Sequence, residues 1–264
     1  MIQFAPVLPP SLYSMLDTGT YHLVQAHHVT NAERSVAMWL DRDSQDPNHV
    51  VILDNGMIEL GSPDIDALRI AADMIKPDIV ICPDMLRDKV ATMDLFTQYV
   101  ETCESLAPAV MVVPQGSSVW QWCQCASLMI DILYRQTHTH FVVGVPKVLD
   151  TFFEGGRYEA ISWLLKSYPQ IKYGYRIHLL GMWYGIGDVK AICRDFSDAI
   201  IGVDSTLPFA HALANTTTGE DAPKCGLDDN DFVNPSTEIS VLWQATLNIA
   251  VVRNYLEQNA VSAH

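Results

Sequence analysis

The sequence lacks any apolar run that approaches the roughly 20 residues needed to span a bilayer. Its N-terminus also lacks the basic start and apolar block of a secretory signal. We therefore expect a soluble, cytoplasmic protein without a membrane partner. Basic residues are scarce, because 16 Lys and Arg stand against 31 Asp and Glu and give a net charge of −15. A surface of that sign repels phosphate backbones and disfavours extended nonspecific nucleic-acid binding.

Two common cofactor and metal signatures are missing as well. No glycine-rich loop of the dinucleotide-binding or P-loop type occurs. The six cysteines have no framework spacing, and Cys123 and Cys125 lie within an expected helix without a second pair at metal-ligand spacing. We therefore interpret the cysteines as buried thiols, and the sequence predicts neither a metal nor a cofactor.

The sequence does contain a regular alternation of short β-branched runs and amphipathic segments. Strands are predicted at 22–26, 50–53, 79–82, 110–113, 141–143, 176–180 and 200–203. Helices are predicted at 31–40, 65–75, 87–106, 119–134, 157–166 and 189–194. The strands recur at roughly 30-residue spacing, which is the length of a βα unit. The pattern predicts an α/β protein with a parallel sheet, and seven clear strands favour a (β/α)₈ TIM barrel over an open sheet.

The length of 264 residues suits one barrel domain over 1–264. Residues 1–20, with three prolines, are expected to form an irregular lead-in, and the eighth strand either lies at 231–235 or is degenerate. Residues 214–237 are polar and turn-rich, and predict a long loop that is either a lid beside the active site or a surface excursion. A closing helix is predicted at 238–260.

Polar residues and glycines follow the predicted strands at their C-terminal ends, where barrel enzymes carry their catalytic groups. In chain order these are Asp54, Asp84, Gln115 with Gly116, Gly144, the segment 178–181, and Asp204. Each aspartate taken alone has an alternative interpretation as a helix cap or turn residue. Three carboxylates in phase with the barrel repeat instead indicate one mouth that holds a nucleophile, an acid/base group and an acceptor for a ligand with N–H donors.

The order of these strand-end motifs resembles the queuine/archaeosine tRNA-guanine transglycosylase superfamily, whose barrel enzymes exchange guanine in a polynucleotide for a 7-deazaguanine. The similarity covers about residues 50–260 and rests on six short motifs in the family's order. They are Leu53-Asp54-Asn55-Gly56, Pro83-Asp84, Val113-Pro114-Gln115-Gly116, Val143-Gly144-Val145, Arg176-Ile177-His178-Leu179-Leu180-Gly181 and Gly202-Val203-Asp204-Ser205-Thr206-Leu207-Pro208.

The resemblance implies a role for each matching residue. Asp204 would be the nucleophile that attacks the sugar C1′, and Asp54 the general acid/base for the leaving and incoming bases. Asp84 would accept from the N1–H and amino group of the guanine-like edge, while Gln115 and the Gly144 N–H would contact its carbonyl side. The remaining residues implied to line the base site are Asn55, Ile58, Gly116, His178, Leu180 and Gly181.

The chain departs from the tRNA enzymes in ways that affect the expected substrate. Only Cys225 stands where those enzymes carry a zinc site, His178 replaces a tyrosine, and Leu180 replaces a methionine. The small, zinc-less form resembles the phage and bacterial branch that places 7-deazaguanines such as preQ0 derivatives in DNA. We therefore expect a pentosyltransferase acting on DNA in preference to tRNA, with a 7-deazaguanine base as the second partner. If the protein is phage-encoded, as the resemblance to this branch allows, it would act in the host cytoplasm.

Three alternatives remain open: a tRNA enzyme, a relative that acts on a free deazapurine nucleoside or base, and a non-enzymatic binding barrel. The oligomeric state is also open, a homodimer included. One locally basic stretch, 147–176, either borders the mouth or forms a solvated helix face. Trp183 just past Gly181 is interpreted mainly as packing, with contact to a nucleotide as the alternative.

Overall fold

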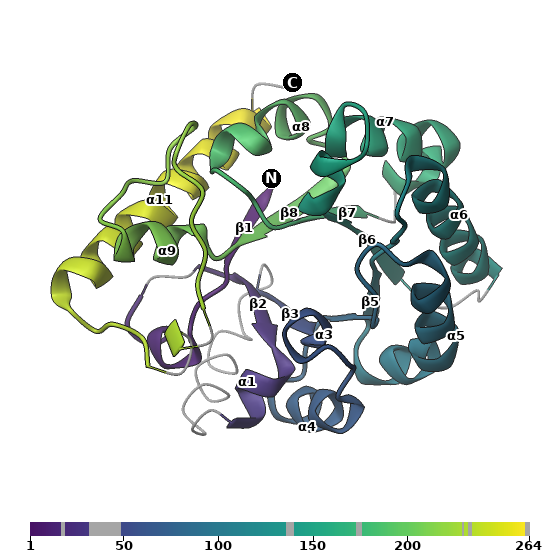
Figure 1. The fold of residues 1–264 in the computed structure, drawn as a ribbon, viewed down its shortest axis with the longest axis horizontal. Helices are drawn as coiled ribbons and strands as arrows, with labels where there is room; N and C mark the ends of the chain where they lie inside the picture. The colour runs from purple at the N-terminus through teal and green to yellow at the C-terminus, as the bar shows by residue number, and fades with distance from the viewer. Residues whose placement is uncertain are drawn as a thin grey trace.

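The computed structural model describes residues 1–16, 19–31, 49–135, 140–172, 176–228, 230–231 and 234–261. Its centre is a sheet of parallel strands (Figure 1). The strands are β1 (Gln3–Pro6), β2 (Tyr21–Gln25), β3 (Val50–Asp54), β4 (Ile79–Ile81), β5 (Ala109–Val112), β6 (His140–Pro146), β7 (Arg176–Leu180) and β8 (Ile200–Ser205). They pair in the order β1-β8-β7-β6-β5-β4-β3-β2, so β1 and β2 are the two edges and the eight-stranded barrel is nearly closed. The predicted (β/α)₈ barrel is thus confirmed.

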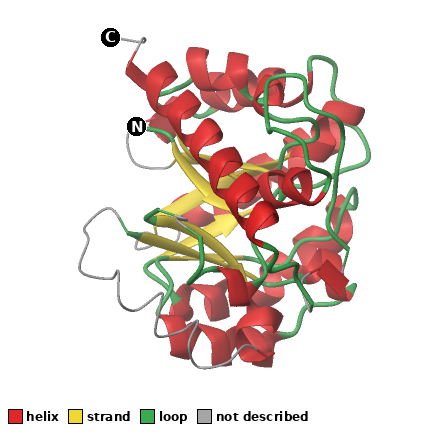
Figure 2. Ribbon diagram, turned by 90° about the vertical axis from the view of Figure 1, so that its left-hand side faces the viewer, coloured by secondary structure: helices red, strands yellow, loops and turns green. Residues whose placement is uncertain are grey.

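Helices surround the strands, as the side view shows (Figure 2). They are α1 (Ala26–Asn31), α3 (Met57–Leu60), α4 (Ile65–Ile75), α5 (Lys89–Leu106), α6 (Val119–Arg135), α7 (Gly156–Ser167), α8 (Lys190–Asp195), α9 (Leu207–Leu213) and α11 (Ile239–Val261). Short 3₁₀ turns lie at Pro10–Leu12, Lys147–Thr151, Pro169–Lys172 and Ile186–Asp188. The last helix, α11, packs against both α9 and β1, so the end of the chain covers its beginning. Within the described ranges, no helix combines the length and apolar character that crossing a bilayer requires.

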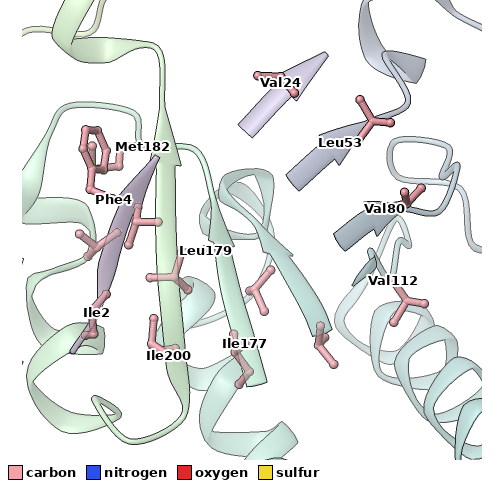
Figure 3. Packing of buried hydrophobic residues seen from close by; sticks show 14 of the residues in the cluster. Ile2, Phe4, Val24, Leu53, Val80, Val112, Ile177, Leu179, Met182 and Ile200 are labelled. Carbon is pink, nitrogen blue, oxygen red and sulfur yellow. The ribbon is translucent and has the colours of Figure 1, made fainter. Parts of the chain in front are cut away.

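The period-2 alternation of the strands divides the core into two layers. In β3, Val51 and Leu53 point outward to the helices, whereas Ile52 points into the barrel. In β5 the outward residues are Val110 and Val112, with the intervening side chain inside the barrel. Figure 3 shows outward-facing side chains from several strands, Leu53 and Val112 among them. The same alternation decides which strand-end side chains reach the barrel mouth.

The eighth strand is not where the sequence analysis placed it. It is β1, within residues 1–20 that were expected to be an irregular lead-in, and not 231–235. β1 pairs only with β8, and its last residue is Pro6, which has no N–H to donate. A four-residue edge strand that ends in proline gives little periodic signal, which explains the error. The other seven predicted strands and most helices are confirmed within a few residues, whereas most of the helix expected at 31–40 lies outside the described residues.

A β-bulge in β8 sets the direction of the residues that follow it. Ile177 of β7 pairs with Ile200, but the next residue, His178, pairs with Gly202, so Ile201 is an extra residue in β8. An extra residue shifts the alternation of a strand by one position. Val203 packs in the outer layer, and Gly202 and Asp204 on either side of it therefore face the barrel interior. The bulge directs the Asp204 carboxyl group toward the mouth.

Candidate active site

Asp204 is held by a chain of buried hydrogen bonds. Its Oδ1 atom lies 3.0 Å from His178 Nε2 and accepts from the Gly181 backbone N–H at 3.3 Å. The other ring nitrogen, His178 Nδ1, lies 2.9 Å from the Tyr21 hydroxyl. His178 is fully buried, and the Asp204 side chain keeps 12% of its surface exposed. The carboxyl group therefore has one side toward the mouth and one side against a Tyr–His pair.

The glycine at position 202 makes this chain of contacts sterically feasible. A Cβ atom there would lie 2.5 Å from Tyr21 Cε1 and 2.8 Å from the Tyr21 hydroxyl oxygen. The bare backbone of β8 thus leaves room for the ring of a residue from β2, across the edge strand β1. Burial, with a contribution from the Asp204 charge, raises the pKa of Tyr21 well above its usual range. The phenol stays protonated and can donate to His178 Nδ1, which leaves the Nε2–H to donate to Asp204.

Asp84 lies in a different environment after β4. Its Oδ2 atom accepts from Gln115 Nε2 at 2.7 Å, and Gln115 Oε1 accepts in turn from the Arg87 backbone N–H at 3.1 Å. Both side chains are buried. Burial raises the pKa of Asp84 to about 7, against an opposing effect of the Gln115 hydrogen bond. Both protonation states of this carboxyl group are therefore accessible near neutral pH.

Asp54 is the last residue of β3 and is partly exposed. Ile52, two residues earlier, belongs to the inner core, so the pleat directs Asp54 to the same interior face. It stands in register with Gln25 of β2, just as Asp204 stands in register with Ala5 of β1. Asp54 and Asp204 therefore lie on the mouth at either side of the β1–β2 edge, with Ala5 and Gln25 at the intervening strand positions.

Asn55 and Leu180, two of the residues expected to line the base site, contact other parts of the protein. Asn55 donates from Nδ2 to the Ile81 carbonyl at 3.2 Å and accepts at Oδ1 from the Met57 N–H at 2.8 Å. These contacts join the end of β3 to the end of β4 and start α3. The side chain of Ile58 lies outside the described residues. Leu180 is partly buried and packs on the inner core, at the edge of the mouth.

The three expected base-site glycines differ in what surrounds them. A Cβ on Gly144 would lie 2.9 Å from both Leu180 Cδ1 and Val113 Cγ2, so this glycine makes space within the inner core. A Cβ on Gly116 would lie 2.6 Å from the Trp122 backbone nitrogen, so this glycine lets the loop approach α6. Gly181 contacts Asp204 directly through its N–H and has a φ of +74°, which favours glycine.

The sequence analysis gave no site role to Tyr21 or Lys224, and it considered Trp183 mainly as packing and Lys147 only as part of the basic stretch. Tyr21 lies one residue before its predicted strand, and its contact with His178 joins positions 157 residues apart. Lys147, Trp183 and Lys224 follow three neighbouring strands and meet beside Gly181: the Lys147 and Lys224 ammonium groups lie 4.5 and 4.3 Å from the centre of the Trp183 ring. The basic stretch at 147–176 contained one of these lysines, but nothing local predicts that the three side chains converge.

The loop after α9 is anchored over this part of the mouth. Ile186 and Gly187 donate backbone hydrogen bonds to the carbonyls of Gly219 and Glu220. His211 and Asn248, both buried, bind the loop backbone at Pro223 and at Thr216 and Thr218. The loop expected at 214–237 therefore lies beside the connection that follows β7. In the part of the chain that the structure describes, no three His, Cys, Asp or Glu side chains converge as a metal site.

Comparison with known proteins identifies the fold but no family. No family model matches the chain, and no curated protein sequence matches it. Among solved structures, a crystal structure of D-psicose 3-epimerase in the presence of D-fructose superimposes with a TM-score of 0.53 at 9% sequence identity. The alignment covers 97% of this chain and 99% of that one. At this identity the match shows the shared TIM-barrel fold and nothing about the reaction.

Proposed function

We propose that the protein is a base-exchange transglycosylase, which replaces guanine in DNA with a 7-deazaguanine base through a covalent glycosyl–aspartate intermediate. The observation that carries the proposal is the arrangement of Asp204 at the barrel mouth, held at one carboxylate oxygen by His178 and the Gly181 N–H. The ordered resemblance of the strand-end motifs to the transglycosylase superfamily supports it. The fold shared with a sugar epimerase agrees with an enzymatic role.

In the first half-reaction, Asp204 attacks C1′ of the target nucleotide. Both contacts of its carboxyl group use Oδ1, so we assign the attack to Oδ2. The C1′–N9 bond breaks, its electron pair leaves with guanine, and Asp54 supplies the proton that neutralises the departing base. The new bond joins C1′ to Asp204. As in retaining glycoside hydrolases, one carboxylate acts as the nucleophile and a second carboxyl group acts as the acid and base. A base within a duplex would have to be flipped out to reach the mouth.

In the second half-reaction, the incoming base loses its N9 proton to Asp54 and attacks C1′. The C1′–O bond breaks, and Asp204 is released as a carboxylate. Asp84 accepts from the N1–H and amino group of either base, and Gln115 holds Asp84 in place. Two N–H donors favour the ionised carboxylate. Because the pKa of Asp84 lies at about 7, base binding should strengthen as the pH rises from 6 to 8.

The proposal is tested by incubating the protein with a guanine-containing DNA oligonucleotide and labelled guanine or preQ0. We expect label in the DNA and a protein–DNA adduct that survives denaturation. Parallel incubations with tRNA and with deoxyguanosine identify the substrate. Incorporation into tRNA alone would replace DNA by tRNA, and exchange with deoxyguanosine alone would indicate a nucleoside enzyme. Absence of exchange with all three would overturn the proposal and favour a binding barrel.

A further inference from the structure

Two lysines beside Asp204 share one aromatic ring. Lys147 follows β6, Trp183 follows β7, and Lys224 belongs to the loop between α9 and α11. The ammonium nitrogens of Lys147 and Lys224 lie 4.5 and 4.3 Å from the Trp183 ring centre, a distance typical of cation–π contacts. The indole N–H donates to the Lys147 carbonyl at 2.9 Å, which fixes the ring between the two strand ends. We call these three residues the lysine clamp.

The fold holds both lysines in place. Lys147 Nζ donates to the Met182 carbonyl at 3.2 Å, and its Cδ atom lies where a side chain at Gly181 would otherwise be. Lys224 directly follows Pro223, whose carbonyl lies 2.7 Å from His211 Nε2. His211 is fully buried, so the backbone at Lys224 is fixed by the core. The clamp is therefore a preformed arrangement.

Among the residues that the structure describes, no close ion pair neutralises the two lysines of the clamp, although the carboxylates of Asp204 and Asp188 act on Lys147 at longer range. The chain has nearly two acidic residues for each basic one, and some of the other described cations form close ion pairs, such as Lys190 with Glu220 at 2.8 Å. Within the described ranges, neither Lys147 nor Lys224 has a carboxylate oxygen within 4.0 Å. Burial lowers the pKa of Lys147 against the opposing charge of Asp204; the charges of Arg157 and Lys224 add to the lowering, and that of Asp188 opposes it. Two like charges close together in an acidic protein indicate a site for an anion.

The clamp adjoins the reacting group. The Gly181 N–H donates to Asp204, and the Gly181 carbonyl accepts from the buried Arg157 at 2.7 Å. Trp183 is two residues further along the chain. An anion at the clamp would thus sit next to a sugar bound at Asp204, which is the position of a phosphate attached to that sugar. Because the Trp183 ring is in contact with ammonium groups, it contributes to an anion site in preference to stacking on a base.

We propose that Lys147 and Lys224, positioned by Trp183, bind a backbone phosphate next to the target nucleotide, and that this contact selects a polynucleotide over a free nucleoside or base. The inference rests on the proposed function for the identity of the sugar at Asp204. The phosphate contact itself does not depend on the exchange reaction. The clamp would give this acidic protein a local basic contact for the substrate strand next to Asp204.

The test compares Lys147→Gln/Lys224→Gln with Lys190→Gln, which removes an exposed lysine that is already paired with Glu220. Binding of a single-stranded, guanine-containing oligonucleotide is measured between 50 and 300 mM salt by fluorescence anisotropy, together with exchange into that oligonucleotide and into deoxyguanosine. The slope of log K against log salt is negative, and losing one phosphate contact should reduce its magnitude by about 0.7. This corresponds to about fivefold weaker binding at 0.1 M salt. Lys190→Gln should retain the wild-type slope. The single variant Lys224→Gln, at an exposed position, gives a smaller loss and serves if the double variant does not fold.

The clamp and the proposed reaction can fail separately. Wild-type slope and affinity in Lys147→Gln/Lys224→Gln would overturn the clamp, even if base exchange is observed. A reduced slope in a protein that exchanges no base would retain the clamp as a phosphate site and reject the transglycosylase. Weaker oligonucleotide binding at an unchanged slope would show a general structural effect, and would also reject the clamp. If the clamp selects polynucleotides, Lys147→Gln/Lys224→Gln should exchange bases in DNA more slowly than wild type. Its rate of exchange with deoxyguanosine should equal the wild-type rate, whether that rate is high or low.

Discussion

The two halves of the barrel mouth hold their carboxyl groups by opposite means. In the β7–β8 half, Asp204 contacts an imidazole and a backbone N–H, with Lys147 close enough to interact with it electrostatically. In the β3–β5 half, Asp84 is buried against the neutral amide of Gln115, and burial raises its pKa to about 7. One half supplies donors and positive charge, and the other supplies little besides an apolar environment. Sites that place two carboxyl groups in such different surroundings can assign them different chemical roles.

The two environments suit the different roles that we propose for Asp204 and Asp84. A nucleophile needs a fixed orientation and donors that tolerate its charge, which β7 and β8 provide through His178 and Gly181. A carboxyl group that recognises N–H donors must have no cation bound to it before the base arrives, because a cation would occupy the same carboxylate oxygens. The Asp84–Gln115 pair meets that condition within the described residues.

Replacing the proposed nucleophile, Asp204, should abolish base exchange without unfolding the protein. In Asp204→Asn the amide oxygen still accepts from the Gly181 N–H, so the thermal midpoint should change little. Exchange should fall about a thousandfold or more, as for the loss of nucleophiles in other enzymes, and the denaturation-resistant adduct should disappear. Asp198→Asn, an exposed carboxylate before the same strand, is the matched control. Exchange that persists in Asp204→Asn at the wild-type rate would move the nucleophile elsewhere.

Asp84→Asn should stabilise the protein at high pH while it impairs base recognition. The raised pKa of Asp84 favours folding fully below about pH 4, and that contribution is lost as the pH rises through about 7. A pKa shift from 3.8 to about 7 corresponds to at most about 4 kcal/mol. The asparagine carries no such cost, so the gain in the free energy of unfolding over wild type should grow from pH 5 to pH 9.

Urea unfolding at several pH values measures this gain. The control is Asp88→Asn, because Asp88 caps α5 by accepting from the Val90 and Ala91 N–H groups and asparagine caps equally well. Its effect should not depend on pH in this range. A difference between Asp84→Asn and wild type that is flat from pH 5 to 9 would show that burial does not perturb Asp84.

Gly144→Ala should test whether this glycine serves the core or the base. Its Cβ would lie 2.9 Å from Leu180 Cδ1 and Val113 Cγ2 and 3.1 Å from Met111 Sδ. Such overpacking costs about 1–3 kcal/mol, which chemical denaturation would detect. Gly226→Ala, with nothing within 4 Å of the added atom, should be close to neutral. If Gly144→Ala retains full stability but loses base affinity, the backbone at Gly144 contacts the base as the resemblance implies.

The sequence predicts repeating features of this molecule well and long-range contacts poorly. The strands from β2 to β8 follow from β-branched runs at regular spacing, and Asp54, Asp84 and Asp204 follow from where those runs end. The strand β1 was not predicted, because it is short, lies at an edge of the sheet and ends in Pro6. The bulge at Ile201 and the convergence of Lys147 and Lys224 on Trp183 depend on pairing between distant segments. No local pattern encodes those pairings, although they determine what surrounds Asp204.

Tyr21→Phe should give the smallest effect and isolates the positioning of His178. Removing the hydroxyl deletes one buried hydrogen bond to Nδ1, worth about 1 kcal/mol, and frees the imidazole to adopt the other tautomer. A ring with its proton on Nδ1 presents a lone pair to Asp204 Oδ1 and repels it. We therefore expect kcat for exchange to fall about five- to tenfold, with KM for the base unchanged and the pH profile of kcat altered.

Tyr13→Phe provides the comparison, because it deletes a buried hydroxyl that donates to the Leu23 carbonyl on the same strand as Tyr21. Tyr13→Phe should lose stability and keep its kcat, whereas Tyr21→Phe should lose stability and have a lower kcat. Equal kcat values in the two variants would show that Tyr21 only fills the space left by Gly202. A selective loss in Tyr21→Phe would show that the β7–β8 half depends on a proton held on β2, across the edge where the barrel closes.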